Sequence, residues 1–523
     1  MSRRKPHTRG VRVGFAALLL VTAALPAGVS ASHGHPNPTF AYISLTPAAA
    51  GGQVVPLINS GQVFDGVTFE GIPDGIGIAP VGNGRRQIDL YVAHEQSHVP
   101  FGGFADLEDS SVLRLRLDLA EKQVVDMREV LPPSAGFIRF CSAFMAGPRE
   151  GFADYTFFAN EESNDWLTVP AGAPYGADPA ITPYRQAGYS VALNTRTGAY
   201  DELDRAGRHN HENLVVVPGG WRDTVALSGD DTFSAPSSQL YLLRAENARD
   251  LVSDDSDLWA FQVTRDNGVA VDPSDPFNDA NDYLEINPSD TFAGRFIRVP
   301  IAIARGKTDL PPQDALEQWS NENNIFQFVR VEDIAYDPDA PRTVYFADTG
   351  TTRLAEDATT GRLVRLASGG ATTNGRIFKM VLNARNPRVV DSLTIHTDAL
   401  AVPAAVGGPM RNPDNLDISA NSIMVQEDTS DAKIWRYDMR AGTWSHVATV
   451  NHPTAPSAGE SSGIVDASAW LGPGWWALDV QSHVNQFVDP GTYMYTHPST
   501  GITDTYQKRR EDGQLLLMQI PGS

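Results

Sequence analysis

The sequence predicts an all-β chain that folds as a six-bladed β-propeller with one loop and helix insertion. Three observations support this prediction: strand-length apolar runs recur along the chain, polar residues recur in six ordered pairs, and only one stretch has a convincing helical pattern. We expect residues 32–523 to form a single propeller domain, because nothing in them has the composition of a linker.

The apolar runs have the length and the boundaries of β-strands. Each is alternating or continuously apolar and is flanked by Gly, Pro, Asp or Asn. The runs are SVLRLRLDL, QIDLYVAH, YTFFAN, NLVVVPG, QLYLLRA, RFIRVPIAIA, TVYFAD, SIMVQED, GWWALDV and QLLLMQI. The helical stretch is PQDALEQWSNEN, residues 312–323, and it falls inside an insertion expected around residues 245–325.

Six pairs of polar positions follow one another along the chain. The first member opens an apolar segment and is, in order, Asp74, Cys141, Glu212, Glu332, Asp414 and Glu460. The second member closes a strand 13 to 21 residues later, counted to the first residue of each cluster: Glu95; Glu161 and Glu162; Asp230 and Asp231; Asp348; Glu427 and Asp428; Gln481 and His483. An antiparallel hairpin has about this length, and it brings both members to the same end.

Six such hairpins arranged radially form the inner halves of six blades. All twelve positions then converge on one face of the central channel. A β-sandwich built from the same strands would scatter these clusters, and it is the alternative fold.

Residues 1–31 have the features of a secretory signal peptide. Five basic residues precede an apolar run from Val13 to Leu25, and Val29-Ser30-Ala31 forms a cleavage site of small residues. The run is too short to span a bilayer, and Ser2-Arg3-Arg4 is compatible with twin-arginine export. We therefore expect a secreted, extracytoplasmic protein without a membrane anchor.

The chain is strongly acidic, with 41 Lys and Arg against 63 Asp and Glu and a net charge of −22. This charge disfavours nucleic acid and anionic membrane surfaces as partners. Acidity alone is typical of a soluble surface, but carboxylates packed into one channel mouth repel each other unless cations offset the charge. Ca²⁺ takes six to eight oxygen ligands of this kind, so the clusters predict calcium binding.

Cys141 is the only cysteine, and it stands where other blades place a carboxylate. A thiolate in an oxygen-rich ring indicates a transition metal, iron or zinc, beside the calcium. An inert buried cysteine that packs as a small hydrophobe is the alternative interpretation.

Arg330 lies two residues before Glu332, so in a strand both side chains point to the same face. A guanidinium in a metal and carboxylate mouth would bind an oxyanion through paired N–H donors. A salt bridge to a neighbouring acid is the alternative role. The nucleophile elbow, the P-loop and the H-E-x-x-H motif are missing, and we place His209 and His211 behind the ring rather than in it.

Several ordered motifs resemble the PhoX-type alkaline phosphatases, which are secreted calcium-dependent enzymes on a six-bladed propeller. They are GRHNHEN followed by LSGDD, RVEDIAYDP followed by VYFADTG, NPDNLDIS followed by VQED, and the late ESSG and DVQSH, and the resemblance extends from about residue 60 to the end. Two segments depart from that family: CSAFMAGP replaces a glycine-rich run after the cysteine, and IPDGIG replaces an Asn-rich phosphate contact.

The resemblance implies two ferric ions and several calcium ions. It places Cys141, Glu212 and Glu332 near iron, and Arg330 on the substrate phosphate. The carboxylates that it assigns to iron or calcium are Glu161, Glu162, Asp230, Asp231, Asp348, Asp414 and Glu427. Glu95 and Glu460 complete the predicted metal-binding set from the pattern of pairs.

These observations favour a secreted phosphatase that hydrolyses small phosphate monoesters at a Ca²⁺ and Fe³⁺ centre, with Arg330 stabilising charge on the phosphoryl oxygens. We expect it to be a monomer. The alternatives are a calcium-dependent lactonase or esterase on a similar propeller, and a non-enzymatic, calcium-stabilised binding propeller. The lactonase or esterase chemistry gives Cys141 and Arg330 no clear role.

Overall fold

The computed structural model describes residues 34–168, 184–232, 236–278 and 280–523. The described residues belong to one compact unit, Gly34–Ser523. The predicted signal peptide, residues 1–31, lies outside the described residues. Within the described ranges, no helix is long and apolar enough to cross a membrane.

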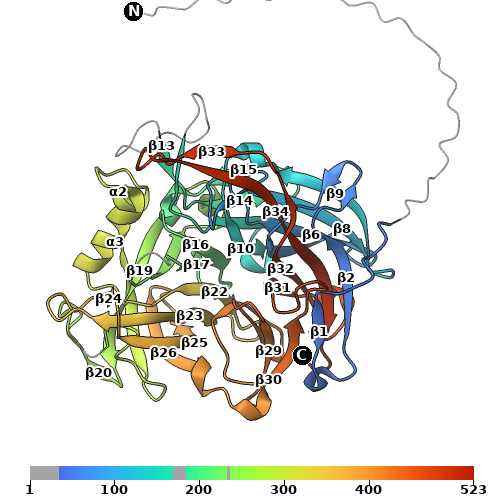
Figure 1. The fold of residues 1–523 in the computed structure, drawn as a ribbon. Coiled ribbons are helices and arrows are strands. Elements are labelled where there is room, and N and C mark those ends of the chain that lie inside the picture. Colours follow the sequence, from blue (N-terminus) through green and yellow to red (C-terminus); the bar gives the residue numbers. More distant parts are fainter. Residues whose placement is uncertain (1–33, 169–183, 233–235, 279) are drawn as a thin grey trace, which may run out of the picture. The chain divides into compact units, whose positions relative to one another are not determined.

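Six antiparallel blades surround a central axis, which confirms the predicted β-propeller (Figure 1). The first blade consists of β5 (Pro73–Pro80), β6 (Gln87–His94), β8 (Ser111–Asp118) and β9 (Gln123–Leu131). The second consists of β10 (Phe140–Ala146), β11 (Thr156–Glu161), β14 (Ser190–Asn194) and β15 (Tyr200–Glu202). The third consists of β16 (His211–Val216), β17 (Thr224–Asp230), β18 (Leu240–Ala245) and β19 (Ser256–Asp266).

The remaining three blades follow the same order from the centre outward. The fourth consists of β22 (Val331–Tyr336), β23 (Thr343–Glu356), β25 (Ala371–Leu382) and β26 (Val389–Asp398). The fifth consists of β27 (Pro413–Ile418), β28 (Ser422–Glu427), β29 (Lys433–Asp438) and β30 (Thr443–Val450). The sixth consists of β31 (Glu460–Asp466), β32 (Trp475–Val488), β34 (Thr503–Gln519) and β2 (Gln53–Asn59).

Strands from the N-terminal part of the chain close the ring. β2 pairs with β34, so the sixth blade combines the two ends of the described chain, seen as the blue and red strands side by side in Figure 1. β1 (Ile43–Leu45) adds to the outer edge of the fifth blade through β30. Closure of this kind leaves no gap between the first and the last blade.

The insertion lies between the third and fourth blades. β21 (Phe292–Arg298) pairs with β19 on one side and β26 on the other, which joins the two blades into one sheet. β19 falls within the range predicted as insertion, so the inserted segment begins after Asp266 rather than near residue 245. Helix α3 (Pro312–Glu322) confirms the predicted helix.

One predicted strand is half wrong. The run RFIRVPIAIA ends as a strand at Arg298, and Ile301–Ala304 form the short helix α2. Pro300 has no N–H to donate to a sheet ladder, so the strand cannot continue through it. The other short elements are β3 (Val63–Phe64), β4 (Val67–Thr68), β7 (Phe104–Asp106), β12 (Trp166–Thr168), β13 (Tyr184–Gln186), β20 (Val269–Ala270), β24 (Leu363–Arg365), β33 (Tyr493–Thr496), α1 (Ala248–Val252) and α4 (Ser468–Leu471).

The hydrophobic core lies in layers between adjacent blades. Tyr91 of the first blade packs with Phe140 and Phe157 of the second, and Tyr345 of the fourth blade packs with Trp435 of the fifth. Burial of these large side chains stabilises each blade against the next. The same contacts hold the six inner strands at the centre.

Candidate functional site

Every inner strand contains one extra residue relative to its partner. In β5, the register moves three residues from Pro73 to Ile76 while β6 moves only two, from His94 to Val92. The same shift follows Phe140, His211, Val331 and Pro413, and it follows Ser462 in β31. A β-bulge turns a side chain away from its usual direction. In five blades the bulge therefore sets the direction of the first member of the polar pair: Asp74, Cys141, Glu212, Glu332 and Asp414.

Glycine permits the close approach of neighbouring inner strands at this level. A Cβ atom on Gly75 would lie 2.4 Å from the backbone nitrogen of Ala143. Gly463 has a φ of +55°, and a Cβ there would lie 2.2 Å from the carbonyl oxygen of Asp74. Both positions therefore require glycine.

A cavity of about 540 Å³ opens where the first members of the six polar pairs converge. Eleven carboxylates and three arginines line it, together with Cys141, Gln481 and His483. The carboxylates are those of Asp74, Glu95, Asp106, Glu162, Glu212, Asp231, Glu332, Asp414, Asp428, Glu460 and Glu511, and the arginines are Arg139, Arg330 and Arg509. The negative charge is therefore far in excess of the positive charge that the chain supplies.

The carboxylates form four overlapping groups of three around the cavity. In each group, one potential ligand atom from each residue lies within 4.8 Å of the others. The groups are Asp74, Glu95 and Cys141; Cys141, Glu162 and Glu212; Glu212, Glu332 and Asp414; and Asp414, Asp428 and Glu460. Because neighbouring groups share members, we call the whole set the channel ring.

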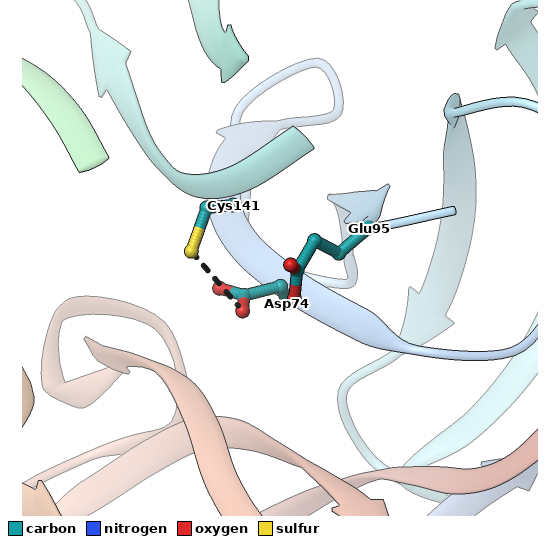
Figure 2. A group of neighbouring side chains, drawn as sticks. All are labelled: Asp74, Glu95 and Cys141. Atoms are coloured by element: carbon teal, nitrogen blue, oxygen red, sulfur yellow. Dashed lines mark hydrogen bonds between the residues drawn. The ribbon is translucent and has the colours of Figure 1, made fainter. Parts of the chain in front are cut away.

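Cys141 links two of these groups. Its side chain is buried, and its Sγ atom lies 3.6 Å from Oδ2 of Asp74. Figure 2 shows Cys141 and Glu95 reaching Asp74 from neighbouring segments. Burial raises the pKa of the Cys141 thiol well above its usual value, and Asp74, Glu212 and Glu162 raise it further. Without a cation, the thiol therefore stays protonated.

The channel ring resists ionisation as a whole. Burial, followed by the neighbouring carboxylates, raises the pKa of Glu162, Glu212, Asp414 and Glu460 well above the usual range. Burial also raises the pKa of Glu95 to about 7. Multivalent cations would reverse this effect, because an opposite charge favours the ionised form.

Buried oxygen atoms without a donor also indicate cations. Oδ1 of Asp74 and Oε1 of Glu212 have no hydrogen-bond partner among the described residues. An unpaired buried carboxylate oxygen is costly, and a metal ion would satisfy it. The donor set fits both expected metals, since carboxylate oxygens suit Ca²⁺ and the sulfur suits a transition metal.

Arg330 lies on the cavity wall with Glu332, as the period of two predicts. Its Nε and Nη2 atoms donate to the two carboxylate oxygens of Asp231, each at 2.6 Å, and Nη2 lies 3.3 Å from Oε1 of Glu332. The salt bridge that the sequence offered as an alternative role is therefore present. Asp231 fixes the orientation of the guanidinium at the cavity.

Five predicted metal-binding carboxylates lie outside the channel ring. Asp231 lines the cavity but is paired with Arg330, whereas the other four do not line the cavity: Glu161, Asp230, Asp348 and Glu427. Glu161 accepts hydrogen bonds from the backbone N–H groups of Ile138, at 2.9 Å, and Tyr189, at 3.1 Å. Asp348 accepts from the backbone N–H groups of Val329 and Arg330, at 3.1 and 3.0 Å.

The other two carboxylates are also occupied by the protein. Glu427 accepts from the backbone N–H of Arg411 and the indole N–H of Trp435, both at 2.9 Å. Asp230 accepts from the hydroxyl of Thr232 at 2.6 Å, and its Oδ2 atom is buried without a partner among the described residues. These four residues therefore lie apart from the channel ring, and each accepts at least one hydrogen bond from the protein.

The backbone explains which acid of each cluster faces the cavity. In five blades, one backbone N–H at the end of the second strand donates to the carbonyl that lies two residues before the first member of the polar pair. The donors are the N–H groups of Glu95, Glu162, Asp231, Thr349 and Asp428. These five positions are therefore equivalent between blades. Consecutive strand residues point to opposite sides, so the acid one position earlier turns away from the cavity.

Sequence reasoning missed several residues near the site. Glu511 of β34 accepts a hydrogen bond from the backbone N–H of His483 at 3.1 Å and lies 3.1 Å from Arg509. Both carboxylate oxygens of Asp479 are buried without a partner among the described residues. Neither acid belongs to a repeated pair, so the sequence carried no signal for them.

His209 and His211 lie outside the four ligand groups, as we predicted. Their rings are 3.7 Å apart, and Nδ1 of His211 lies 2.8 Å from Oγ of Ser228. Burial lowers the pKa of His211 to about 3, so this imidazole is neutral.

Comparison with known proteins gives a likeness of fold. No protein-family model and no curated protein matches the sequence. The fold is similar to that of PhoX from Pseudomonas fluorescens, solved in complex with vanadate. The TM-score is 0.61 at 15% identity, and the alignment covers 93% of this chain and 97% of that one. A glucose dehydrogenase matches with a TM-score of 0.33 at 12% identity, over 78% of this chain and 95% of that one.

Proposed function

We propose that this protein is a metal-dependent phosphatase that hydrolyses phosphate monoesters in the channel cavity, at a centre of Ca²⁺ and Fe³⁺. The observation that carries the proposal is the presence of Cys141, Arg330 and the carboxylate groups in one cavity. The similar PhoX structure contains vanadate, a transition state analogue. Lactonase chemistry would give the thiol no clear role and would limit the guanidinium to its salt bridge with Asp231.

The charge of the cavity makes metal a requirement for this reaction. A phosphate monoester is a dianion near neutral pH, and the carboxylates that do ionise in this cavity would repel it unless bound cations offset their charge. In this proposal Cys141, Glu212, Glu332 and Asp414 would hold the cations, and their membership of groups with ligand spacing supports it. When bound, such cations supply Lewis acidity toward a phosphoryl oxygen.

Arg330 would orient the phosphoryl group. Asp231 holds the Nε and Nη2 edge of the guanidinium, which leaves the Nη1 N–H groups to donate to an oxyanion. A fixed donor stabilises developing charge without reorganising during the reaction. The anchored guanidinium therefore serves as the phosphate-binding group.

We also propose that the protein acts outside the cytosol after removal of residues 1–31. Mass spectrometry of the protein recovered from the extracytoplasmic fraction tests this, and the expected N-terminus is Ser32. Recovery of the uncleaved chain from the cytosol alone would contradict export.

A hydrolase assay tests the proposed activity. Purified protein is incubated with p-nitrophenyl phosphate, p-nitrophenyl acetate and a γ-lactone, before and after treatment with a chelator. We expect hydrolysis of the phosphate monoester only, its loss on chelation, and its recovery when calcium and ferric iron are returned. Hydrolysis of the lactone or acetate without phosphatase activity would favour the esterase alternative, and no turnover would favour the binding propeller.

A further inference from the structure

A second group of carboxylates lies away from the channel ring, where the insertion meets the fourth blade. Asp282 and Glu285 belong to the inserted segment between β20 and β21, and Glu356 is the last residue of β23. One carboxylate oxygen of each lies within 4.8 Å of the others. None of the three lines the channel cavity.

Asp282 is fully buried, with 0% of its surface exposed. Its Oδ1 atom accepts a hydrogen bond from the backbone N–H of Leu284 at 2.7 Å. Its Oδ2 atom is buried and has no partner among the described residues. A carboxylate oxygen in this position is costly unless a cation or a donor approaches it.

The described part of the chain places no cation in direct contact with this group. Among the described residues, no Lys, Arg or His forms an ion pair with Asp282, Glu285 or Glu356. Arg362 is near enough to lower the pKa of Asp282, but its Nη1 atom donates to the carbonyl of Ile325 at 3.0 Å. The three carboxylates therefore lie together without an ion pair to a basic side chain among the described residues, and Arg362 offsets their charge only from a distance.

The electrostatics agree with this geometry. Burial, together with the charge of Glu356, raises the pKa of Asp282 to about 6. Burial, together with Asp282 and Glu356, raises the pKa of Glu285 to about 8. Carboxylates behave in this way when they share a site without a cation.

The spacing suits a calcium ion. Ca²⁺ binds oxygen at about 2.3–2.6 Å, so two ligands of one ion lie at most about 5 Å apart. The 4.8 Å limit of this group falls within that distance. Three carboxylates also offer six oxygens, and Ca²⁺ accepts carboxylates in either one-oxygen or two-oxygen mode.

We propose that Asp282, Glu285 and Glu356 bind a structural Ca²⁺ ion that fastens the insertion to the fourth blade. Two backbone hydrogen bonds connect the loop around Asp282 to Gln327. The N–H of Tyr283 donates to the carbonyl of Gln327 at 2.9 Å, and the N–H of Gln327 donates to the carbonyl of Asn281 at 3.1 Å. Gln327 lies three residues before Arg330. The ion would therefore also stabilise the segment that leads into the channel. This site is independent of the proposed phosphatase reaction.

Calcium stoichiometry tests the site. Glu285→Gln and Glu356→Gln are compared with Glu121→Gln, which removes an exposed carboxylate in another blade. After equilibration with calcium and removal of the free ion, each test variant should hold one Ca²⁺ fewer per chain than the control. Their thermal midpoints should also rise less on addition of calcium. Equal calcium content and equal midpoint shifts in test and control variants would overturn the proposal.

Hydrogen exchange shows which residues calcium stabilises. Because it can be measured on the unaltered protein, it tests the site even if a variant folds poorly. In the unaltered protein, added calcium should slow exchange of the amides in residues 281–285. The same protection should persist in Glu460→Gln, which alters only the channel ring, so failure of the phosphatase proposal would not affect this result. Unchanged exchange at 281–285 on addition of calcium would contradict the site.

Discussion

The guanidinium of Arg330 pairs with Asp231 and, in our proposal, also binds the substrate phosphate. A conservative substitution tests the second of these roles. Lysine keeps the positive charge but cannot reproduce the paired N–H contacts with Asp231 or with a phosphate. We expect Arg330→Lys to keep the fold and to reduce kcat/KM for phosphate monoesters by about 100-fold. Steady-state kinetics beside a thermal melt measure both effects. A folded variant with the parent rate would limit Arg330 to its salt bridge.

At the residue scale, the sequence shows which clusters matter but not which acid of a cluster faces the cavity. Glu161 and Glu162 are adjacent and chemically alike, yet Glu161 accepts backbone hydrogen bonds while Glu162 belongs to a ligand group. The choice depends on a one-residue bulge in the paired strand. A bulge has no residue signature of its own here, so periodicity alone could not place it.

At the scale of elements, the end of β11 offers two matched substitutions, because Glu161 and Glu162 are adjacent but face different sides. Glu161→Gln weakens contacts with the backbone N–H groups of Ile138 and Tyr189, so we expect a loss of about 2 kcal/mol in stability with unchanged metal content. Glu162→Gln should lose metal instead. In the metal-free state it should be more stable than the parent, because a buried carboxylate of raised pKa has been removed.

Thermal melts and metal analysis of both variants, with and without chelator, measure this difference. If Glu161→Gln lost metal while Glu162→Gln kept it, our assignment of the two faces would be reversed.

The hairpins were the elements that the sequence predicted best. Each pair of polar residues marks one end of an inner hairpin, and all six inner strands occur where the pairs place them. The edges of the insertion were harder to predict. β19 belongs to the third blade although it lies within the range that we predicted as insertion, and the apolar run through Pro300 changes from strand to helix. Pairing with β18 places β19 in the blade, and the missing N–H of Pro300 ends the other strand.

At the scale of the whole molecule, the channel ring links metal, pH and stability. The pKa of Glu95 is raised to about 7 in the folded chain, above the value of an exposed glutamate. A raised acid pKa adds stability at low pH, and this contribution is lost as pH rises through the folded value. We expect chelator-treated protein to melt at a lower temperature at about pH 8 than at about pH 6.

Calcium should reduce this pH dependence, because bound cations favour the ionised carboxylates and stabilise the folded state by mass action. Differential scanning calorimetry at both pH values, with chelator or with calcium, measures the effect. A melting temperature that is unchanged after verified metal removal would contradict the ring as a cation site.

The propeller itself was predictable because the six polar pairs follow one another along the sequence, one pair for each blade. Its closure was not, since β2 contains no member of a pair and finds its place only by pairing with β34. The same limit applies to the second carboxylate group. Asp282, Glu285 and Glu356 come from separate segments that only the folded chain brings together.

Elemental analysis of the native protein tests the central claim most directly, with Cys141→Ser measured beside it. We predict both iron and calcium in the purified, active protein, and a colour from sulfur-to-iron charge transfer. Serine replaces a soft anionic ligand by a neutral hydroxyl, so iron, colour and phosphatase activity should fall together in Cys141→Ser while calcium largely remains. Calcium as the only metal in active protein, or parental iron and activity in Cys141→Ser, would contradict the account.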